Sequence, residues 1–572
     1  MKQFFKMVTA VLVGLCAFFF MVFIVILVFS ASASAPSAVK EGSVLHLRLE
    51  GELDERSQES VYTSLGLADY KMGLDDILLA ISAAKTDDNI EGIFLEPGAL
   101  MCGSASLSEI RSALLDFRSS GKFVYAYSGA YTQGAYFLST AADSVFLNPS
   151  GTVDWRGMAY RCSFYKRLLE KVGIEMQVVK VGVYKSFTEQ YTNEKMSDAN
   201  REQMKAFVGD IWKTVSDSVA VARNIPANVL QLAADSMLSF QSADSVLAMG
   251  MVDVLAYRDE VLKCLNKRLG KDSTAKIPTI SPTDYVAQLL PSDNGGDEVA
   301  VVYAVGEIDN GNTDGINTEN LSKELLKLAN NDEVKAVVLR VNSPGGSAYG
   351  SEQVWHALQV LKQKKTLVVS MGDYAASGGY YISCGADLIV ADPLTITGSI
   401  GIFGVIPNIG PLADKIGLDY DVVKTSEGAD FPRVMGPMTP VQQRRVQNYV
   451  NNGYALFTKR CADGRKMDPA ALEAIAQGRV WSGYSAVQIG LVDTLGTLSD
   501  ATRIAADLAN LSDYHVKDYP AKPTLWESMM ETPSLGTQMF APKEFEREKK
   551  AIEQSLKLDI LQAALPFNLV IE

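Results

Sequence analysis

The sequence predicts an α/β fold that occurs twice in tandem behind an N-terminal transmembrane helix. Three observations lead to this prediction. An uncharged apolar run lies near the N-terminus, the rest of the chain repeats itself, and each repeat alternates short β-branched runs with helical apolar patterns. A chain of 572 residues is also too long for one ordinary domain.

The apolar run extends from Met7 to Ser30 and follows Lys2 and Lys6. At about 1.5 Å per residue, it is long enough to cross a bilayer. We expect it to be retained as a single-pass anchor, although the small residues 31–36 could also form a cleavage site. The positive charge before the run predicts a cytoplasmic N-terminus, with the bulk of the chain on the outer side of the inner membrane.

The repeat has a spacing of 244 residues over most of its length. Residues 88–95 match residues 332–339, and residues 134–139 match residues 378–383, in the same order along the chain. Between the copies, residues 270–297 are rich in proline and contain a Ser-Asp-Asn-Gly-Gly run, which is typical of a linker. We therefore predict four parts: the cytoplasmic stub and anchor (1–36), an N-terminal domain (37–269), the linker (270–297) and a C-terminal domain with its tail (298–572).

Within the second copy, the elements follow one another in the order of an α/β domain. Residues 299–305 are strand-like, and residues 321–328 have the apolar spacing of a helix. Residues 334–339 and 366–370 are again strand-like and rich in β-branched residues. Alternation of this kind predicts largely parallel sheets covered by helices.

Composition excludes several classes of function. A net charge of −14 argues against nucleic acid as a partner, because phosphate binding needs a basic surface. The chain has only three histidines, and none lies in a catalytic or zinc-binding motif. Its six cysteines include no CxxC pair. We therefore expect neither a metal nor a cofactor, and any catalytic base should be a residue other than histidine.

The two copies differ at the ends of their strands, where catalytic groups are usually placed. The second copy has Arg340-Val-Asn-Ser-Pro-Gly-Gly-Ser347, whereas the first has Glu96-Pro-Gly-Ala-Leu-Met-Cys-Gly103. Adjacent glycines let backbone N–H groups converge on an anion, as an oxyanion hole requires. A simple turn between strand and helix would explain the same glycines.

A serine follows the next strand of the second copy. Ser377 lies in the small-residue stretch Asp373-Tyr-Ala-Ala-Ser-Gly-Gly-Tyr380, where a helix N-terminus would favour developing negative charge. The matching residue of the first copy is Gln133, which cannot act as a nucleophile. The alternative is that Ser377 merely caps a helix.

A lysine shows the opposite pattern. Lys185, in Val181-Gly-Val-Tyr-Lys-Ser-Phe187, is replaced by Ala429 in the second copy. A lysine in apolar surroundings loses its proton more easily and can then act as a base. Most lysines are solvated and inert, but the serine occurs only in copy two and this lysine only in copy one, which favours a shared site.

Four motifs together carry a resemblance to a known family: Asn-Ser-Pro-Gly-Gly at 342–346, Tyr-Ala-Ala-Ser-Gly-Gly-Tyr-Tyr at 374–381, Thr-Gly-Ser-Ile-Gly at 397–401 and Val-Tyr-Lys-Ser at 183–186. The chain resembles the long, tandem-domain signal peptide peptidases of family S49, which are membrane-anchored Ser/Lys peptidases with Clp-protease/crotonase-like domains. The resemblance implies the following roles: Ser377 as nucleophile, Lys185 as general base, Ser399 (Trp155 in the first copy) as the residue that orients the lysine amine, and Gly345, Gly346 and Gly378 as candidates for the oxyanion hole.

The resemblance further implies a serine endopeptidase of the bacterial inner membrane that degrades remnant signal peptides and other apolar peptides on the periplasmic side, works without a cofactor and forms a homotetramer. Two alternatives are a crotonase-like acyl-CoA hydrolase or isomerase and a catalytically inactive membrane scaffold. For the tail from Lys543 to Glu572, the sequence favours a surface helix that packs on a neighbouring subunit over a segment that mimics a substrate or touches the membrane.

Overall fold

The computed structural model describes residues 39–57, 73–289, 296–309 and 315–522, the backbone of 561–564 and a few positions between 6 and 21. No helix within these residues is both long and apolar enough to cross a membrane. Most of the predicted anchor, Met7 to Ser30, lies outside the described residues.

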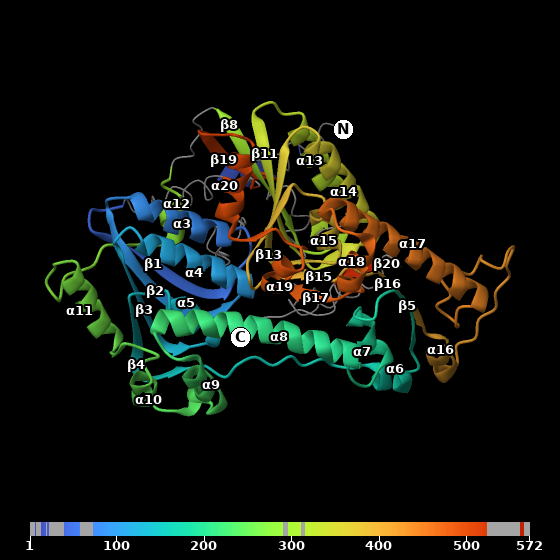
Figure 1. Ribbon diagram of the computed structural model, residues 1–572, viewed down its shortest axis with the longest axis horizontal. Helices are drawn as coiled ribbons and strands as arrows, with labels where there is room; N and C mark the ends of the chain where they lie inside the picture. The colour runs from blue at the N-terminus through green and yellow to red at the C-terminus, as the bar shows by residue number, and fades with distance from the viewer. Residues whose placement is uncertain are drawn as a thin grey trace.

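The first copy is built on a six-stranded, wholly parallel sheet, shown in blue to green in Figure 1. The segment predicted as a linker, 270–297, supplies the short edge strand β7, which pairs with Val44 and Leu45 of β1. In sheet order the strands are β6 (Val254–Leu255), β4 (Ser144–Val153), β3 (Phe123–Tyr131), β2 (Ile90–Met101), β1 (Ser43–Glu52) and β7 (Thr279–Ile280).

The second copy has an eight-stranded sheet in which the strand pairs are parallel except for β15 with β17. Its central strands are almost continuous apolar runs, because both faces of the sheet are covered. The main path runs β17 (Val480–Ser482), β15 (Ile396–Gly398), β13 (Thr366–Ala376), β11 (Val334–Ser343), β8 (Asp297–Val305) and β19 (Tyr514–Tyr519), with β14 (Leu388–Ala391) on β13 and β18 (Thr494–Leu495) on β14.

The helices cover the two sheets in the same way. In the first copy, α3, α4, α5 and α8 pack on one face and α11 on the other. In the second copy, α13, α14, α15 and α17 pack on one face and α20 on the other. Their bounds are α3 (Leu74–Thr86), α4 (Ser104–Arg118), α5 (Gln133–Ser139), α8 (Asp198–Arg223), α11 (Arg258–Arg268), α13 (Thr318–Ala329), α14 (Ala348–Lys362), α15 (Gly378–Ser383), α17 (Pro440–Arg465) and α20 (Leu498–Leu508).

Shorter helices complete the two copies: α6 (Lys166–Val172), α7 (Glu189–Thr192), α9 (Ala227–Asp235), α10 (Ala243–Ala248), α12 (Pro282–Val286), α16 (Gly410–Ile416), α18 (Pro469–Ile475) and α19 (Gly483–Gln488), with single 3₁₀ turns η1 (Ser186–Thr188) and η2 (Leu238–Phe240).

Matching details confirm that the α/β domain is duplicated. Helices α4 and α14 both have 15 residues and start 244 positions apart, at 104 and 348. The long helices α8 and α17 both have 26 residues. Near the end of each long helix, an arginine pairs with an aspartate that follows α10 or α19. Arg223 pairs with Asp253 at 2.7 Å, and Arg465 pairs with Asp493 at 2.6 Å.

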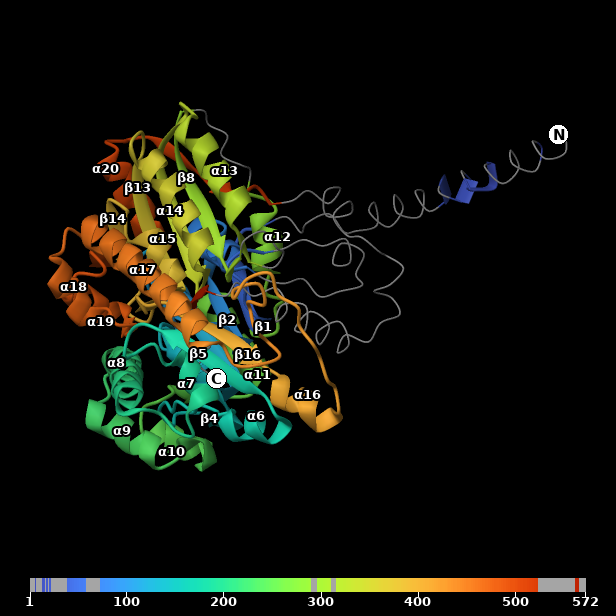
Figure 2. The same cartoon turned by 90° about the vertical axis from the view of Figure 1, so that its right-hand side faces the viewer.

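A third sheet joins the copies. Strand β5 (Glu175–Lys180) of the first copy runs antiparallel to β16 (Phe403–Asn408) of the second, and the two lie side by side in Figure 2. Val179 of β5 is only 3% exposed and belongs to the core of the second copy. The other strands of this sheet are β10 (Ile316–Asn317), β9 (Ile308–Asp309), β12 (Gly345–Ser347) and β20 (Leu561–Ala564).

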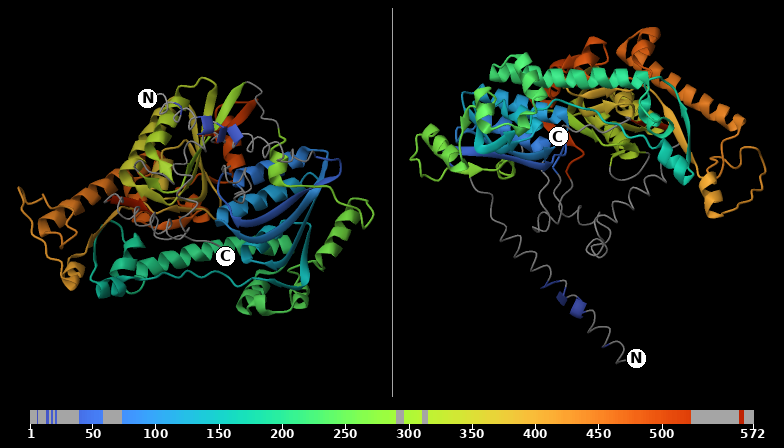
Figure 3. Two further views of the ribbon diagram at one scale, coloured as in Figure 1. Left: turned by 180° about the vertical axis from the view of Figure 1, so that it is seen from behind. Right: turned by 90° about the horizontal axis from the view of Figure 1, so that it is seen from below.

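The long helix α8 also contacts both copies. It touches α5 of the first copy and β17 of the second, and Figures 1 and 3 show it lying along one edge of the two sheets. The two copies are therefore packed into one body, with the second-copy strand ends facing segments supplied by the first.

Candidate active site

Ser377 stands at the sharp junction between β13 and α15. Its backbone has φ +56° and ψ −113°, a strained conformation for a residue with a side chain. The Ser377 N–H donates to the carbonyl of Gly398 at 2.8 Å, and the Ser377 carbonyl accepts from Tyr381 in the first turn of α15. The surrounding hydrogen bonds thus hold the buried serine at the end of its strand and the N-terminus of a helix, a position suited to a nucleophile.

Lys185 reaches this serine from the first copy, in the loop between β5 and η1. The loop is fixed to the second copy by the N–H of Tyr184, which donates to the carbonyl of Gln477 at 2.9 Å. Gly478 lies so close that a Cβ there would come within 2.7 Å of the Lys185 Cβ. The lysine is fully buried, and this burial holds the pKa of its amine well below its ordinary value.

The lysine amine has three polar neighbours. Its Nζ lies 2.8 Å from Ser377 Oγ, 2.9 Å from Ser399 Oγ and 3.0 Å from the Ser399 carbonyl oxygen. A neutral amine has two N–H donors and one lone pair. If the two donors serve the oxygens of Ser399, the lone pair faces the hydroxyl hydrogen of Ser377. The geometry thus accommodates a neutral lysine that can accept the proton of the serine.

Ser399 owes its position to another unusual backbone conformation. It follows β15 with φ +53°, and its N–H donates to the carbonyl of Arg479 at 2.7 Å. This turn brings both its hydroxyl and its carbonyl oxygen to Lys185. The structure therefore places all three residues of the predicted Ser/Lys site in one contact group.

The three predicted oxyanion donors lie around the same strand ends but are not equivalent. The N–H of Gly345 already donates to Ser343 Oγ at 3.2 Å. Gly346 has φ +151°, and a Cβ there would come within 2.1 Å of the Ile308 carbonyl oxygen, so only glycine fits. Gly378 is the first residue of α15, where a helix leaves its N–H groups without internal acceptors.

An extended segment of the chain itself lies against these glycines. Strand β20 from the C-terminal tail runs antiparallel to β12, with Ala564 opposite Gly345 and Ala563 opposite Gly346. On its other side, β20 pairs with Phe403 and Gly404 of β16. The described part of the tail is therefore a strand, whereas residues 543–550, which begin the surface helix that the sequence favours, lie outside the described residues. The position between β12 and β16 thus accepts an extended backbone as an additional strand.

At the equivalent place, the first copy has no comparable site. Gln133 stands where Ser377 does, and its Oε1 accepts from the N–H groups of Arg156 and Gly157 at 3.2 and 3.1 Å. Trp155 replaces Ser399, is completely buried and donates its indole N–H to the Leu230 carbonyl. The Trp155 indole packs against the rings of Tyr136 and Trp212.

Sequence reasoning missed a buried ionic group behind the strand ends. Arg340 of β11 is completely buried and pairs with Glu55 and Glu109 of the first copy. A signal was present, because an arginine inside an otherwise apolar strand needs a buried partner.

Comparisons with known proteins agree with the duplicated fold. The profile of Peptidase family S49 matches residues 116–271 and 359–512, and the profile of Clp protease matches residues 302–389. Protease 4 of Salmonella typhi is 36% identical over 540 residues, which cover 92% of this chain and 84% of that protein. Protease 4 of Haemophilus influenzae is 33% identical, covering 88% and 85%, respectively. The chloroplastic serine protease SPPA of Arabidopsis thaliana is 31% identical, covering 83% and 70%.

The family profile thus matches once in each copy, and the relatives extend over both copies in one alignment. The duplicated Clp-protease-like domains, the strand-end serine and these matches together show that the chain belongs to peptidase family S49, in its long tandem form, and that it is a serine peptidase.

Proposed function

We propose that this serine peptidase is an endopeptidase of the bacterial inner membrane that degrades remnant signal peptides with a Ser/Lys dyad. The observation that carries the proposal is the 2.8 Å distance between Ser377 Oγ and the buried Lys185 Nζ. The apolar run at residues 7–30 would anchor the enzyme, with the N-terminus in the cytoplasm and both copies on the periplasmic side.

In the proposed reaction, neutral Lys185 accepts the proton of Ser377 while Ser377 Oγ attacks the scissile carbonyl. Donors that become aligned with the developing oxyanion stabilise the tetrahedral intermediate. Gly346 and Gly378 are the better candidates, since the N–H of Gly345 is already bound to Ser343 Oγ. Protonated Lys185 then donates to the leaving amine. Lys185, now neutral again, deprotonates a water molecule, which releases the acyl group from the serine.

Peptide is favoured over acyl-CoA because of the strand position between β12 and β16, next to the candidate oxyanion glycines. Strand β20 lies between β12 and β16 with main-chain pairing on both sides, which is how β-strand addition binds an extended peptide. A cleaved signal peptide could bind in the same way. Phe403 of β16 adds an apolar wall, with its ring centroid 5.9 Å from Lys185 Nζ.

A direct test uses the full chain in detergent with two substrates in parallel, a synthetic signal peptide and a medium-chain acyl-CoA. We expect cleavage within the apolar core of the peptide, followed by mass spectrometry, and no release of CoA. Thioester turnover without peptide cleavage would instead favour the crotonase-like function, and inactivity on both substrates would favour a scaffold.

We also propose that the enzyme forms a homo-oligomer, a tetramer by resemblance, through strands that one chain leaves unmatched. The repeat relates β5 to residues 419–424 and β16 to residues 159–164. Neither of these two segments belongs to a strand among the described residues. Val423, the counterpart of buried Val179, is 97% exposed. A second copy of the chain could supply the missing partner.

The β5–β16 register predicts the contact between chains. In that register, Val405 of β16 lies opposite Val178 of β5. At the spacing of 244, these positions correspond to Arg161 and Val422, so Arg161 of one chain should lie opposite Val422 of the next. Pairing of this kind is heterologous and closes into a ring when the rotation per subunit allows it.

A cysteine pair tests the predicted register. Mild oxidation of the Arg161→Cys/Val422→Cys variant should give covalent dimers and higher multimers on a denaturing gel, since residues directly opposite on antiparallel strands have Cα atoms about 4.5–5.5 Å apart, within the range of a disulfide. The matched control is Arg161→Cys/Val423→Cys, whose second cysteine points to the other face of the strand. Equal crosslinking in both variants, or a monomeric mass in light scattering, would contradict the pairing.

A further inference from the structure

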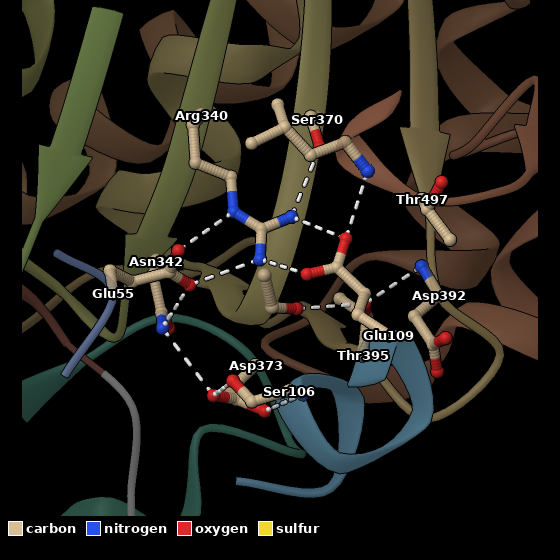
Figure 4. A network of polar contacts seen from close by, with 12 residues as sticks. Glu55, Ser106, Glu109, Arg340, Asn342, Ser370, Asp373, Asp392, Thr395 and Thr497 are labelled. Carbon is tan, nitrogen blue, oxygen red and sulfur yellow. Dashed lines mark hydrogen bonds and ion pairs between the residues drawn. The ribbon is translucent and has the colours of Figure 1, made fainter. Parts of the chain in front are cut away.

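A buried polar cluster connects the first copy with the two strands that end at the proposed active site. Figure 4 shows this cross-copy cluster, which consists of Arg340, Asn342 and Asp373 of the second copy and Glu55, Ser106 and Glu109 of the first. All six side chains are buried or nearly so.

The guanidinium of Arg340 uses all five of its N–H donors. Two of them bind the Glu55 carboxylate at 3.0 and 3.1 Å, and two bind the Glu109 carboxylate at 3.0 and 2.6 Å. The fifth donates to Ser370 Oγ at 3.1 Å. Both ion pairs are bidentate, a geometry that fixes the plane and the position of the arginine.

The second contact point is the carboxylate of Asp373. It accepts the backbone N–H of Ser106 at 2.9 Å and the Ser106 hydroxyl at 2.6 Å. Gly103 allows this approach, because a Cβ there would lie 2.0 Å from the Asp373 Cγ. Gly372 does the same for Glu55, whose Oε1 would lie 2.6 Å from an added Cβ.

Asn342 links the two strands at the point where their regular pairing breaks. The register between β11 and β13 shifts between Val341 and Ser343. There the Asn342 side chain accepts from the N–H of Tyr374 at 3.0 Å and donates to Glu55 at 2.8 Å. The strands continue from this point to Gly345 and Ser377, respectively, within a few residues.

The cluster is as one-sided as the Ser/Lys pair. At the spacing of 244, Arg340 corresponds to Glu96 and Asp373 to Gly129. In the other direction, Glu109 corresponds to Gln353 and Ser106 to Gly350. The repeat therefore does not reproduce these cluster residues at the equivalent positions of the other copy. Among the described residues, the cluster lies at the junction of the two copies, where Lys185 also meets Ser377.

We propose that the cross-copy cluster positions the reacting groups: its first-copy carboxylates and Ser106 hold the ends of β11 and β13 so that the oxyanion glycines and Ser377 are in register with Lys185. The cluster residues act through the strands and do not contact the dyad. A buried ionic group of this kind is a weak source of stability, because desolvation offsets its attraction. Its value lies in geometry, since a misplacement of about 1 Å can cost roughly 100-fold in rate.

The experiment compares two serine-to-alanine variants, one within α4 and one at its C-cap. Ser106→Ala removes the hydroxyl that binds Asp373, whereas Ser119→Ala removes a hydroxyl that binds the Asp116 carbonyl in the last turn of α4. For the full-length enzyme and a signal peptide, we expect Ser106→Ala to lower kcat roughly tenfold or more with KM within about twofold. Fluorophosphonate labelling of Ser377 should slow by a similar factor.

Four results decide the proposal, which rests on Ser377 being the nucleophile. Glu109→Gln, which acts through Arg340, should show the same loss in kcat without a matching loss in KM. Equal kcat values for Ser106→Ala and Ser119→Ala would overturn the proposal, as would recovery of full activity at a temperature where each variant is completely folded. Activity that survives in Ser377→Ala would instead overturn the assignment of the nucleophile.

Discussion

Alanine at position 377 is expected to abolish peptide hydrolysis while leaving the fold intact. Removal of a nucleophile that works together with its base typically costs about 10⁴–10⁶ in kcat. The change deletes one hydroxyl, whose partner is Lys185 Nζ at 2.8 Å. The strained backbone at φ +56° is kept in place by the bonds of the Ser377 N–H and carbonyl, which alanine retains.

Steady-state hydrolysis of a signal peptide measures this loss, with far-ultraviolet circular dichroism and the unfolding temperature as checks on the fold. Ser383→Ala is the matched control, since this buried serine lies on α15, the helix that Ser377 precedes, and donates to the Gly379 carbonyl. It should retain activity within about twofold. A Ser377→Ala enzyme with more than a few per cent of normal kcat would contradict the assignment.

The sequence was sufficient to single out the two residues of the proposed dyad because the duplication supplies its own comparison. At the spacing of 244, Ser377 corresponds to Gln133 and Lys185 to Ala429, so each copy lacks the residue that the other has. The structure brings these two side chains, 192 positions apart, within hydrogen-bond distance. The α/β order of each copy was equally accessible, since β-branched runs and helical spacing are local properties of the chain.

What the repeat could not predict is where the two copies become unequal. Residues 178–180 and 422–424 match in sequence, yet only the first group forms a strand. A strand needs a partner, and one chain contains a single junction at which β5 can reach β16. The environment of Val423, 97% exposed, therefore differs from that of Val179 for tertiary reasons alone.

Arg340 signals a buried partner, but the identity of its partners in the cross-copy cluster lies beyond sequence reasoning for the same reason. Arg340 and its carboxylate partners are separated by 285 and 231 positions, and nothing local distinguishes Glu55 or Glu109 from solvated glutamates. Burial also shifts the pKa of a side chain away from the value that its residue type alone suggests. Asp392, close to the cluster in Figure 4, has its carboxyl pKa raised to about 7 by burial, with Glu109 and Asp373 adding to the effect.

Lys185→Met should remove the base and also change how stability depends on pH. We expect kcat to fall by about 10³–10⁴, because Ser377 would keep its proton at neutral pH. The wild-type enzyme should gain activity as pH rises through the lowered pKa of the amine, since the neutral form accepts the proton. Lys185→Arg should be inactive at every pH, because a guanidinium stays protonated.

The sign of the stability effect follows from the same lowered pKa. In the unfolded chain the lysine holds its proton up to about pH 10.4, whereas in the folded protein it loses the proton at lower pH. Between these two pKa values the unfolded state binds more protons, so the stability of the wild-type protein rises with pH and falls as pH is lowered.

Methionine does not titrate, so the Lys185→Met protein does not lose stability in this way as pH is lowered. Thermal unfolding at several pH values should therefore show a flatter profile for Lys185→Met and a higher unfolding temperature than wild type at neutral pH, whereas exposed Lys195→Met should follow the wild type. If the unfolding temperature of the inactive Lys185→Met protein depends on pH as that of the wild type does, the lysine is charged in the folded state. A proton acceptor other than Lys185 would then be required.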